Sequence, residues 1–241
     1  MPARPPYTGF AWRLDEVASA GRENLDAEHV ALYDQKEDGG AAAEVELLLG
    51  LGLDARSTVV DLGAGTGQFA LAAARRCRRV VAVDVSPVML NRLQHKLAAA
   101  ALLNVELVSA GFLSYEHQGD LADVVYTRWA LHHLPDFWKV LALARMRAVL
   151  RPGGILRLVD IVYSFDPHDA DVRLEQWCSS LPTDATSAGE WTRADIEEHV
   201  RDEHSTFTWL LEPMMERAGF RIEHTSVSAD NLFAEYIARA V

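Results

Sequence analysis

Asp61-Leu62-Gly63-Ala64-Gly65-Thr66-Gly67 directly follows the β-branched run Thr58-Val59-Val60, and a helix-forming run from Gln68 to Arg76 comes next. Glycines permit positive φ and let the backbone approach a ligand closely. The start of a helix offers unpaired N–H groups. A strand, a glycine loop and a helix in this order are typical of a nucleotide-type pocket at the C-terminal edge of a parallel sheet. Taken alone, the stretch also fits a tight strand-to-helix turn without a ligand.

The glycine spacing separates two kinds of nucleotide loop. A dinucleotide fingerprint has the spacing G-x-G-x-x-G, or Ala in the last place. In this chain the glycines are Gly63, Gly65 and Gly67, and Gln68 occupies the place of the third fingerprint glycine. The spacing therefore disfavours an NAD(P)-dependent oxidoreductase, which stays as an alternative.

A second buried-strand pattern, residues 79–84, ends in an acid. An acid about 20 residues after such a loop can accept hydrogen bonds from two ribose hydroxyls. Asp84 could instead cap the next helix, since Ser86-Pro87 opens it. Serine before proline is a good cap by itself, so we expect Ser86 to cap the helix and Asp84 to serve a ligand.

Composition limits the class of protein. The chain has 241 residues, of which 49% are hydrophobic, enough for one α/β domain with a modest appendage. No apolar run approaches the length of a membrane span, and the N-terminus lacks the apolar stretch of a signal peptide. Cys77 and Cys178 are too few for a disulfide framework. These features favour a cytoplasmic protein with no membrane partner.

The net charge is −12. Affinity for nucleic acid depends on Lys and Arg that neutralise phosphates, so an acidic chain disfavours a nucleic-acid partner. The only basic cluster is Arg75-Arg76 with Arg78-Arg79, at the end of a predicted helix, where cations complement the helix dipole.

Strand and helix patterns alternate through the middle of the chain, which predicts a parallel sheet with helices on both faces. Predicted strands are 58–62, 80–84, 105–109, 123–127 and 155–159, followed by a final strand pair near 220–224 and 232–237. We divide the chain into an N-terminal arm with cap helices (1–53), a core (54–163), a cap insert (164–205) and a C-terminal helix with the strand pair (206–241).

Two helices carry apolar residues at i, i+4 spacing, which predicts the faces that pack on the sheet. In the insert, Thr192-x-x-Asp195 resembles a capping box, although the usual box has Glu or Gln. The two apolar stripes are Met89, Leu93 and Leu97, and then Phe137, Leu141, Ala144 and Ala148.

Four ordered stretches resemble motifs of class I S-adenosylmethionine (SAM)-dependent methyltransferases, most closely the ubiquinone-biosynthesis-like subgroup. The glycine loop resembles motif I of this family, with Asp84 as the following acid. The other matches are Asp123-Val124-Val125-Tyr126-Thr127-Arg128-Trp129-Ala130-Leu131-His132-His133-Leu134-Pro135-Asp136, Leu150-Arg151-Pro152-Gly153-Gly154 and Ala218-Gly219-Phe220. The resemblance implies a Rossmann-like fold, with a seven-stranded sheet whose last strand is antiparallel. The N-terminal arm and the helical insert are expected to form a cap.

The resemblance also implies SAM as cofactor and S-adenosylhomocysteine as product. Asp61 is then expected near the methionine amino group, Asp84 at the ribose and Val85 near adenine. The glycine loop and the end of the fourth strand complete the predicted contacts, namely Gly63, Ala64, Gly65, Gly67, Thr127, Arg128 and Trp129.

One departure concerns the adenine side. Many relatives have an acid after the third strand, but this chain reads Ser109-Ala110-Gly111-Phe112. We expect Gly111 or Phe112 to contact adenine instead. Tyr33, and with it Lys36, is expected either to cover the cofactor or to lie on a helix surface.

Methyl transfer needs alignment of the acceptor more than covalent help. A base is required only where the acceptor loses a proton, and His132 and His133 are the candidates; their alternative is to start a helix. Arg128 could bind a carboxylate or phosphate of the substrate or form an ion pair with Asp160 or another acid at a strand end. No ligands for a metal are evident beside the two histidines, so we expect no metal.

The sequence predicts a SAM-dependent methyltransferase with a small-molecule acceptor. A non-catalytic SAM-binding domain and a tRNA methyltransferase stay as alternatives. The N-terminal arm is a candidate contact of a homodimer.

Overall fold

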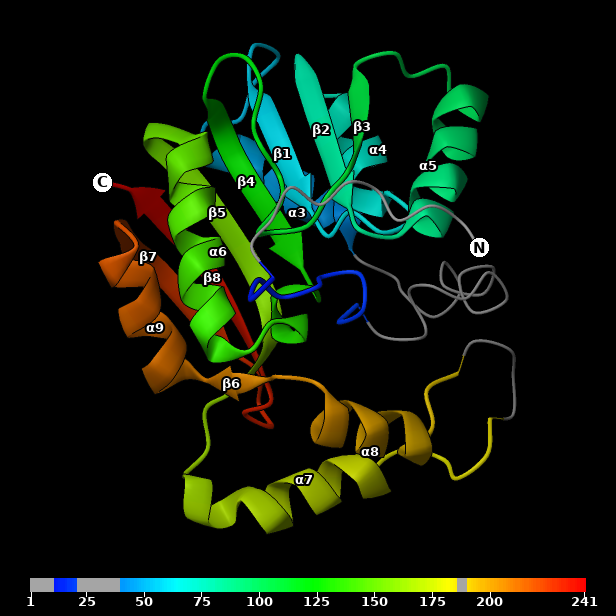
Figure 1. The fold of residues 1–241 in the computed structure, drawn as a ribbon, viewed down its shortest axis with the longest axis vertical. Coiled ribbons are helices and arrows are strands. Elements are labelled where there is room, and N and C mark those ends of the chain that lie inside the picture. Colours follow the sequence, from blue (N-terminus) through cyan, green and yellow to red (C-terminus); the bar gives the residue numbers. More distant parts are fainter. Residues whose placement is uncertain (1–10, 21–39, 186–189) are drawn as a thin grey trace.

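The computed structural model describes residues 11–20, 40–185 and 190–241 (Figure 1). Its main sheet follows the strand order β3-β2-β1-β4-β5-β8-β7. The parallel strands are β1 (Thr58–Leu62), β2 (Arg79–Asp84), β3 (Val105–Ser109), β4 (Ala122–Arg128) and β5 (Leu150–Tyr163). Strand β8 (Phe233–Ala240) runs antiparallel to both β5 and β7 (Phe220–Val227). An eighth strand, β6 (Thr206–Phe207), pairs only with the end of β5.

This arrangement confirms the predicted fold class and the antiparallel last strand. It also confirms the five predicted core strands. Strand β5 is longer than expected, because Leu150-Arg151-Pro152-Gly153-Gly154 continues as extended chain.

Helices cover both faces of the sheet (Figure 1). Alternating strand residues divide the core into two clusters, with Val59 in one and Val60 in the other. On one face lie α3 (Ala41–Gly50), α4 (Gln68–Ala74) and α5 (Pro87–Ala99). On the other lie α6 (Asp136–Val149) and α9 (Thr208–Arg217). Among the described residues, no helix is both long and apolar enough to cross a bilayer.

The buried face of α5 is the predicted one, with Met89, Leu93 and Leu97 buried. For α6 the predicted face was wrong. Phe137 is 65% exposed and Leu141 38% exposed, whereas the buried row is Lys139, Ala142, Leu143, Met146 and Val149. A lysine in the row concealed it, because a charged residue is not expected on a buried face. Lys139 can be buried because its amine donates to Asp136 at 2.9 Å and to the carbonyl of His204.

The insert folds as η2 (Pro167–Asp169), α7 (Ala170–Ser179) and α8 (Arg193–Asp202). Figure 1 shows α7 and α8 beyond the carboxyl end of β5. The predicted capping box of α8 is present, with Thr192 and Asp195 bonding each other's backbone N–H. Tyr163, Phe165 and Leu232 form a small buried cluster beneath this insert.

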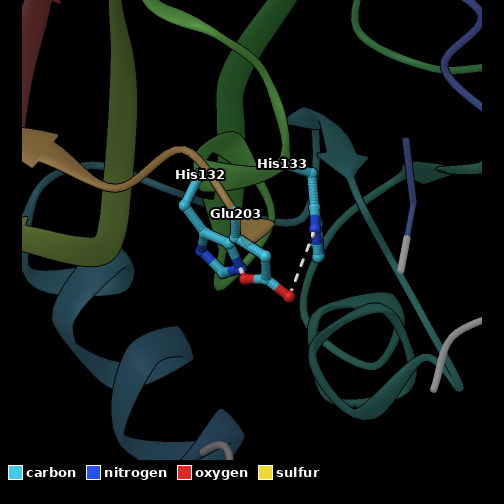
Figure 2. Close-up of side chains that lie close together, drawn as sticks. All are labelled: His132, His133 and Glu203. Carbon is cyan, nitrogen blue, oxygen red and sulfur yellow. Dashed lines mark ion pairs between the residues drawn. The ribbon is translucent and has the colours of Figure 1, made fainter. Parts of the chain in front are cut away.

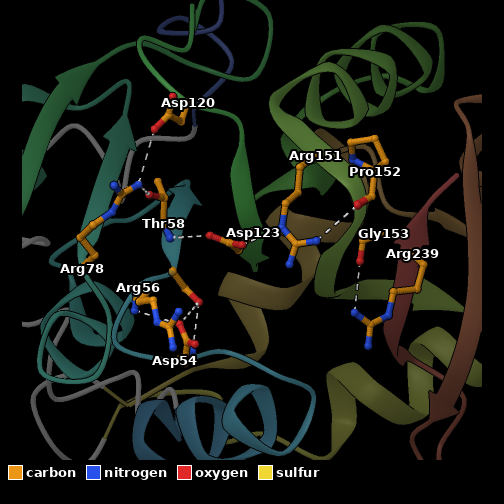
Figure 3. A network of polar contacts seen from close by, with 11 residues as sticks. Asp54, Arg56, Thr58, Arg78, Asp120, Asp123, Arg151, Pro152, Gly153 and Arg239 are labelled. Carbon is orange, nitrogen blue, oxygen red and sulfur yellow. Dashed lines mark hydrogen bonds and ion pairs between the residues drawn. The ribbon is translucent and has the colours of Figure 1, made fainter.

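Polar contacts close the opposite edge of the sheet (Figure 3). The Asp123 carboxylate accepts from the Thr58 N–H at 2.7 Å and from Nε of Arg151 at 2.7 Å. Arg78 donates to the Thr58 hydroxyl at 3.0 Å. At the amino ends of β1 and β4, these side chains thus form their hydrogen bonds with one another.

Candidate active site

Two adjoining cavities lie at the carboxyl ends of β1, β2 and β4. They share Gly63, Gly65 and Trp129. The first is lined further by Glu16, Ser19, Ala20, Asp84, Val85, Ala110, Gly111, Phe112, Ala130, His133 and Leu134. The second is lined further by Ala41, Asp61, Ala64, Thr66, Gly67, Gln68, Phe69, Tyr126 and Arg128. The structure therefore brings most of the sequence-predicted residues together, divided between two compartments.

Two glycines of the loop, Gly63 and Gly65, line both cavities. Gly63, Gly65 and Gly67 have φ of 75°, 53° and 83°, in the left-handed region that favours glycine. A Cβ on Gly63 would lie 2.4 Å from Cβ of Ala130, so a larger residue does not fit there. Trp129 has φ 50°, an unusual backbone conformation for a bulky residue, and it contributes to both cavities.

Asp84 forms part of the wall of the first cavity. Its carboxylate accepts from the Gly65 N–H at 2.8 Å and the Ser86 N–H at 2.8 Å. Ser86 caps α5 by accepting from the Met89 N–H, which confirms that the serine is the cap. A carboxylate has about four acceptor positions, so Asp84 retains capacity for two hydroxyl donors. Burial raises its pKa.

Asp61 lines the second cavity from the end of β1. It is 2% exposed, and its Oδ2 has no hydrogen-bond partner in the described structure. Burial and the nearby charge of Asp84 raise the pKa of Asp61 to about 8. An orphaned buried carboxylate oxygen is costly, and a cationic ligand group would satisfy it.

Arg128 lines the same cavity from the end of β4. Its Nη1 lies 3.8 Å from Oε1 of Glu44, and the guanidinium stands over the Trp129 ring at 5.1 Å. Glu44, in α3, is thus its acid partner. The alternative pairing with Asp160 is wrong, because His132 contacts Asp160. Buried Nε of Arg128 has no hydrogen-bond partner in the described part of the chain.

The first cavity contains an acid that the sequence reading missed. Glu16 is 5% exposed, and its carboxylate accepts from the Leu113 N–H at 2.9 Å and the Ser114 hydroxyl at 2.8 Å. It thereby lies against Gly111, at the place where the chain after β3 has no acid. Burial raises the pKa of Glu16. Nothing local to residues 11–20 marks this role.

The two histidines occupy different environments. His132 is buried in η1 (Leu131–His133), where its Nδ1 lies 2.5 Å from Asp160 and its Nε2 lies 3.1 Å from Glu203. Burial opposes its charge, but the two carboxylates raise the pKa of His132 to about 10. His132 lines neither cavity. His133 lines the first cavity, and burial together with the charge of His132 lowers its pKa to about 3.

Further predicted cofactor contacts are Thr127, the residues of the adenine side, and Tyr33 with Lys36. Thr127 is buried and lines neither cavity, whereas Val85, Gly111 and Phe112 line the first. Tyr33 and Lys36 lie outside the described residues.

Comparison with known proteins shows similarity to methyltransferases. Residues 59–154 match a family model described as a methyltransferase domain. The trans-aconitate 2-methyltransferase of Paracidovorax citrulli is 34% identical over 131 residues, covering 53% of this chain and 48% of that protein. The chain spans about half the length of the curated relatives it matches.

Solved structures agree on the fold. The N-methyltransferase NodS from Bradyrhizobium japonicum, in complex with S-adenosylhomocysteine, has a TM-score of 0.60 at 18% identity, covering 94% of this chain and 99% of that one. A SAM-dependent methyltransferase from Aquifex aeolicus has a TM-score of 0.61 at 18% identity, covering 90% and 100%. Residues 59–154 are thus similar to methyltransferase domains, and the chain has the fold of solved SAM-dependent methyltransferases. The ubiquinone-biosynthesis-like subgroup stays a prediction.

Proposed function

We propose that the chain transfers a methyl group from SAM to a small-molecule acceptor. One observation carries the proposal: Oδ2 of Asp61 and Nε of Arg128 are both buried without hydrogen-bond partners among the described residues, and both residues line one cavity. A carboxyl oxygen and a guanidinium N–H without partners in the described structure suit the ammonium and carboxylate groups of an amino acid. The adjoining cavity, with Asp84 and Phe112, suits an adenosine.

This division matches SAM and distinguishes it from a dinucleotide, which has no amino-acid moiety. Bound SAM supplies an electrophilic methyl group with its own leaving group. The residues of the chain orient the cofactor and the acceptor and exclude water. Trp129, between the two cavities, separates the predicted amino-acid side from the nucleoside side.

The acceptor side of the proposal rests on His133. It reaches the first cavity from η1, next to Leu134 and Ala130. Its imidazole can form a hydrogen bond with a polar group of an acceptor and so orient it. His132 is not assigned this role, because Asp160 and Glu203 occupy both of its ring nitrogens. The trans-aconitate relatives favour a small organic acid as the first acceptor to test.

The cofactor assignment is tested by calorimetric titration with two ligands. S-adenosylhomocysteine contains the amino acid, whereas methylthioadenosine contains only the nucleoside part. We expect Asp84→Ala to weaken both ligands. Arg128→Gln should weaken only S-adenosylhomocysteine, by about tenfold or more, as for the loss of a charge-assisted hydrogen bond. Asp171→Ala, at an exposed carboxylate, is the control.

Binding of NADH or NADPH in place of S-adenosylhomocysteine would overturn the cofactor assignment. Turnover is tested by following S-adenosylhomocysteine release from SAM with a panel of small organic acids that includes trans-aconitate. Tight cofactor binding with no turnover on a broad acceptor panel would favour the non-catalytic alternative.

A further inference from the structure

We propose that His132, His133 and Glu203 form a binding site for one divalent transition-metal ion of the zinc type. The site adjoins the first cavity through His133, and the inference does not depend on methyl transfer. Figure 2 shows the two imidazoles from η1 converging on the carboxylate, which arrives from the C-cap of α8. The sequence expectation of no metal overlooked Glu203, because only the folding of the insert brings it beside the histidines.

The distances suit an ion. Nε2 of His132 lies 3.1 Å from Oε2 of Glu203, and Nδ1 of His133 lies 3.9 Å from Oε1. All three ligand atoms lie within 4.8 Å of one another. Zinc bonds of about 2.0–2.2 Å hold two ligands of one ion roughly 3–4 Å apart. Small movements of the three side chains would therefore bring all three ligand atoms within bonding distance of one ion.

A second layer of contacts already orients the ligands. Asp160 accepts from Nδ1 of His132 at 2.5 Å and from its backbone N–H at 3.1 Å. This fixes the ring so that Nε2 points to the site. Nδ1 of His199 contacts Oε2 of Glu203, and Nε2 of His199 lies 2.9 Å from the Ser205 hydroxyl. A carboxylate behind a ligating histidine is the usual outer contact of protein metal sites.

The ligand types define the class of ion. Two imidazoles and one carboxylate suit zinc, iron or cobalt, whereas calcium and magnesium prefer oxygen alone. Three protein ligands also leave a coordination position open. His133 lines the first cavity, so the open position is expected on the cavity side, where it can take an oxygen of a bound acceptor.

The test uses full-length protein freed of metal with a chelator. Zinc is titrated calorimetrically, and cobalt is titrated with its visible absorption as a coordination signal. We expect one zinc ion per chain. Glu203→Gln, which keeps the size of the side chain, should weaken zinc binding at least about tenfold, because a ligand is lost. His133→Ala should do the same.

The matched control is His168→Ala, because His168 is an exposed histidine with its own acid partner, Asp166. S-adenosylhomocysteine binding by Glu203→Gln checks that the variant is folded. The proposal is overturned if wild-type protein binds no stoichiometric zinc, or if Glu203→Gln binds it as well as the His168→Ala control. In that case a proton alone bridges His132 and Glu203. Intact S-adenosylhomocysteine binding without zinc binding would leave the proposed function standing.

Discussion

At the scale of single residues, the buried carboxyl group of Asp61 affects both the free energy of unfolding and the proposed ligand binding. Asp61 is buried at the end of β1, one of its oxygens has no partner among residues 11–20, 40–185 and 190–241, and its pKa is raised to about 8. A carboxyl group whose pKa is higher in the folded state than in the unfolded chain binds a proton more tightly when folded. Its contribution is therefore most favourable at low pH and is lost as pH rises towards 8.

Asp61→Asn should separate the effect of Asp61 on stability from its effect on ligand binding. Without the ligand, we expect the variant to be more stable than wild type at pH 8.5, by about 1 kcal/mol or more, because each unit of displaced pKa corresponds to about 1.4 kcal/mol. The difference should shrink towards pH 4. Thermal unfolding at both pH values measures it, with Asp171→Asn as the exposed control.

The same substitution should weaken S-adenosylhomocysteine binding, because the ammonium group loses its partner. Stability and affinity are thus expected to change in opposite directions. A variant that is less stable than wild type at pH 8.5 would mean that ionised Asp61 already has a stabilising partner.

At the scale of elements, a buried ion pair fastens α3 to the sheet. Glu44 accepts from Nε and Nη2 of Arg157, each at 2.7 Å, and Arg157 is only 1% exposed. Burial opposes the charge of Arg157, but Glu44 and Glu235 raise its pKa overall. Because Glu44 also faces Arg128, the position of α3 is coupled to the second cavity.

Two glutamates of α3 provide a matched comparison. Glu44→Ala should reduce the free energy of unfolding by about 3 kcal/mol, since it leaves a buried guanidinium with one partner. Glu46 also pairs with an arginine, Arg76, at 2.6 Å, but both side chains are exposed. Glu46→Ala should cost at most about 1 kcal/mol. Urea denaturation compares them, and equal losses would show that the pair does not anchor the helix.

At the scale of the whole molecule, charge argues against a polynucleotide acceptor. The chain carries a net charge of −12. Three of the four arginines in its basic cluster pair with acids, namely Arg76 with Glu46, Arg79 with Glu106 and Arg78 with Asp120. These pairings reduce the positive charge that the cluster can offer to phosphates.

We expect no saturable binding of unfractionated tRNA at 150 mM salt, about physiological strength, in a filter-binding assay. Methyl transfer to tRNA should likewise stay at background. Saturable binding that weakens steeply with added salt would instead show phosphate contacts and would revive the tRNA methyltransferase alternative.

The cap also belongs to the whole-molecule scale. Helices α7 and α8 form the insert, and Glu203 at the end of α8 contacts both histidines. Trp177 of α7 packs edge-on against His199 and Phe233. Trp177 thus joins the insert to the core.

The sequence by itself determined the parts that depend on spacing along the chain. The glycine loop, Asp84 at the end of the next strand and the Ser86 cap are each encoded within a few neighbouring residues. Strands and amphipathic helices likewise follow local periodicity. For this reason the core strands and the fold class could be predicted from the residues.

Only the tertiary structure decided which distant charges meet. Glu16, Glu44 and Glu203 reach the site region from the N-terminal segment, α3 and the end of α8. The buried face of α6 was concealed by Lys139 for the same reason, since its acceptor at His204 is remote in sequence. A charged residue shows in sequence that it needs a partner, but the partner is chosen by packing, because burial raises the free-energy cost of leaving a charge unpaired.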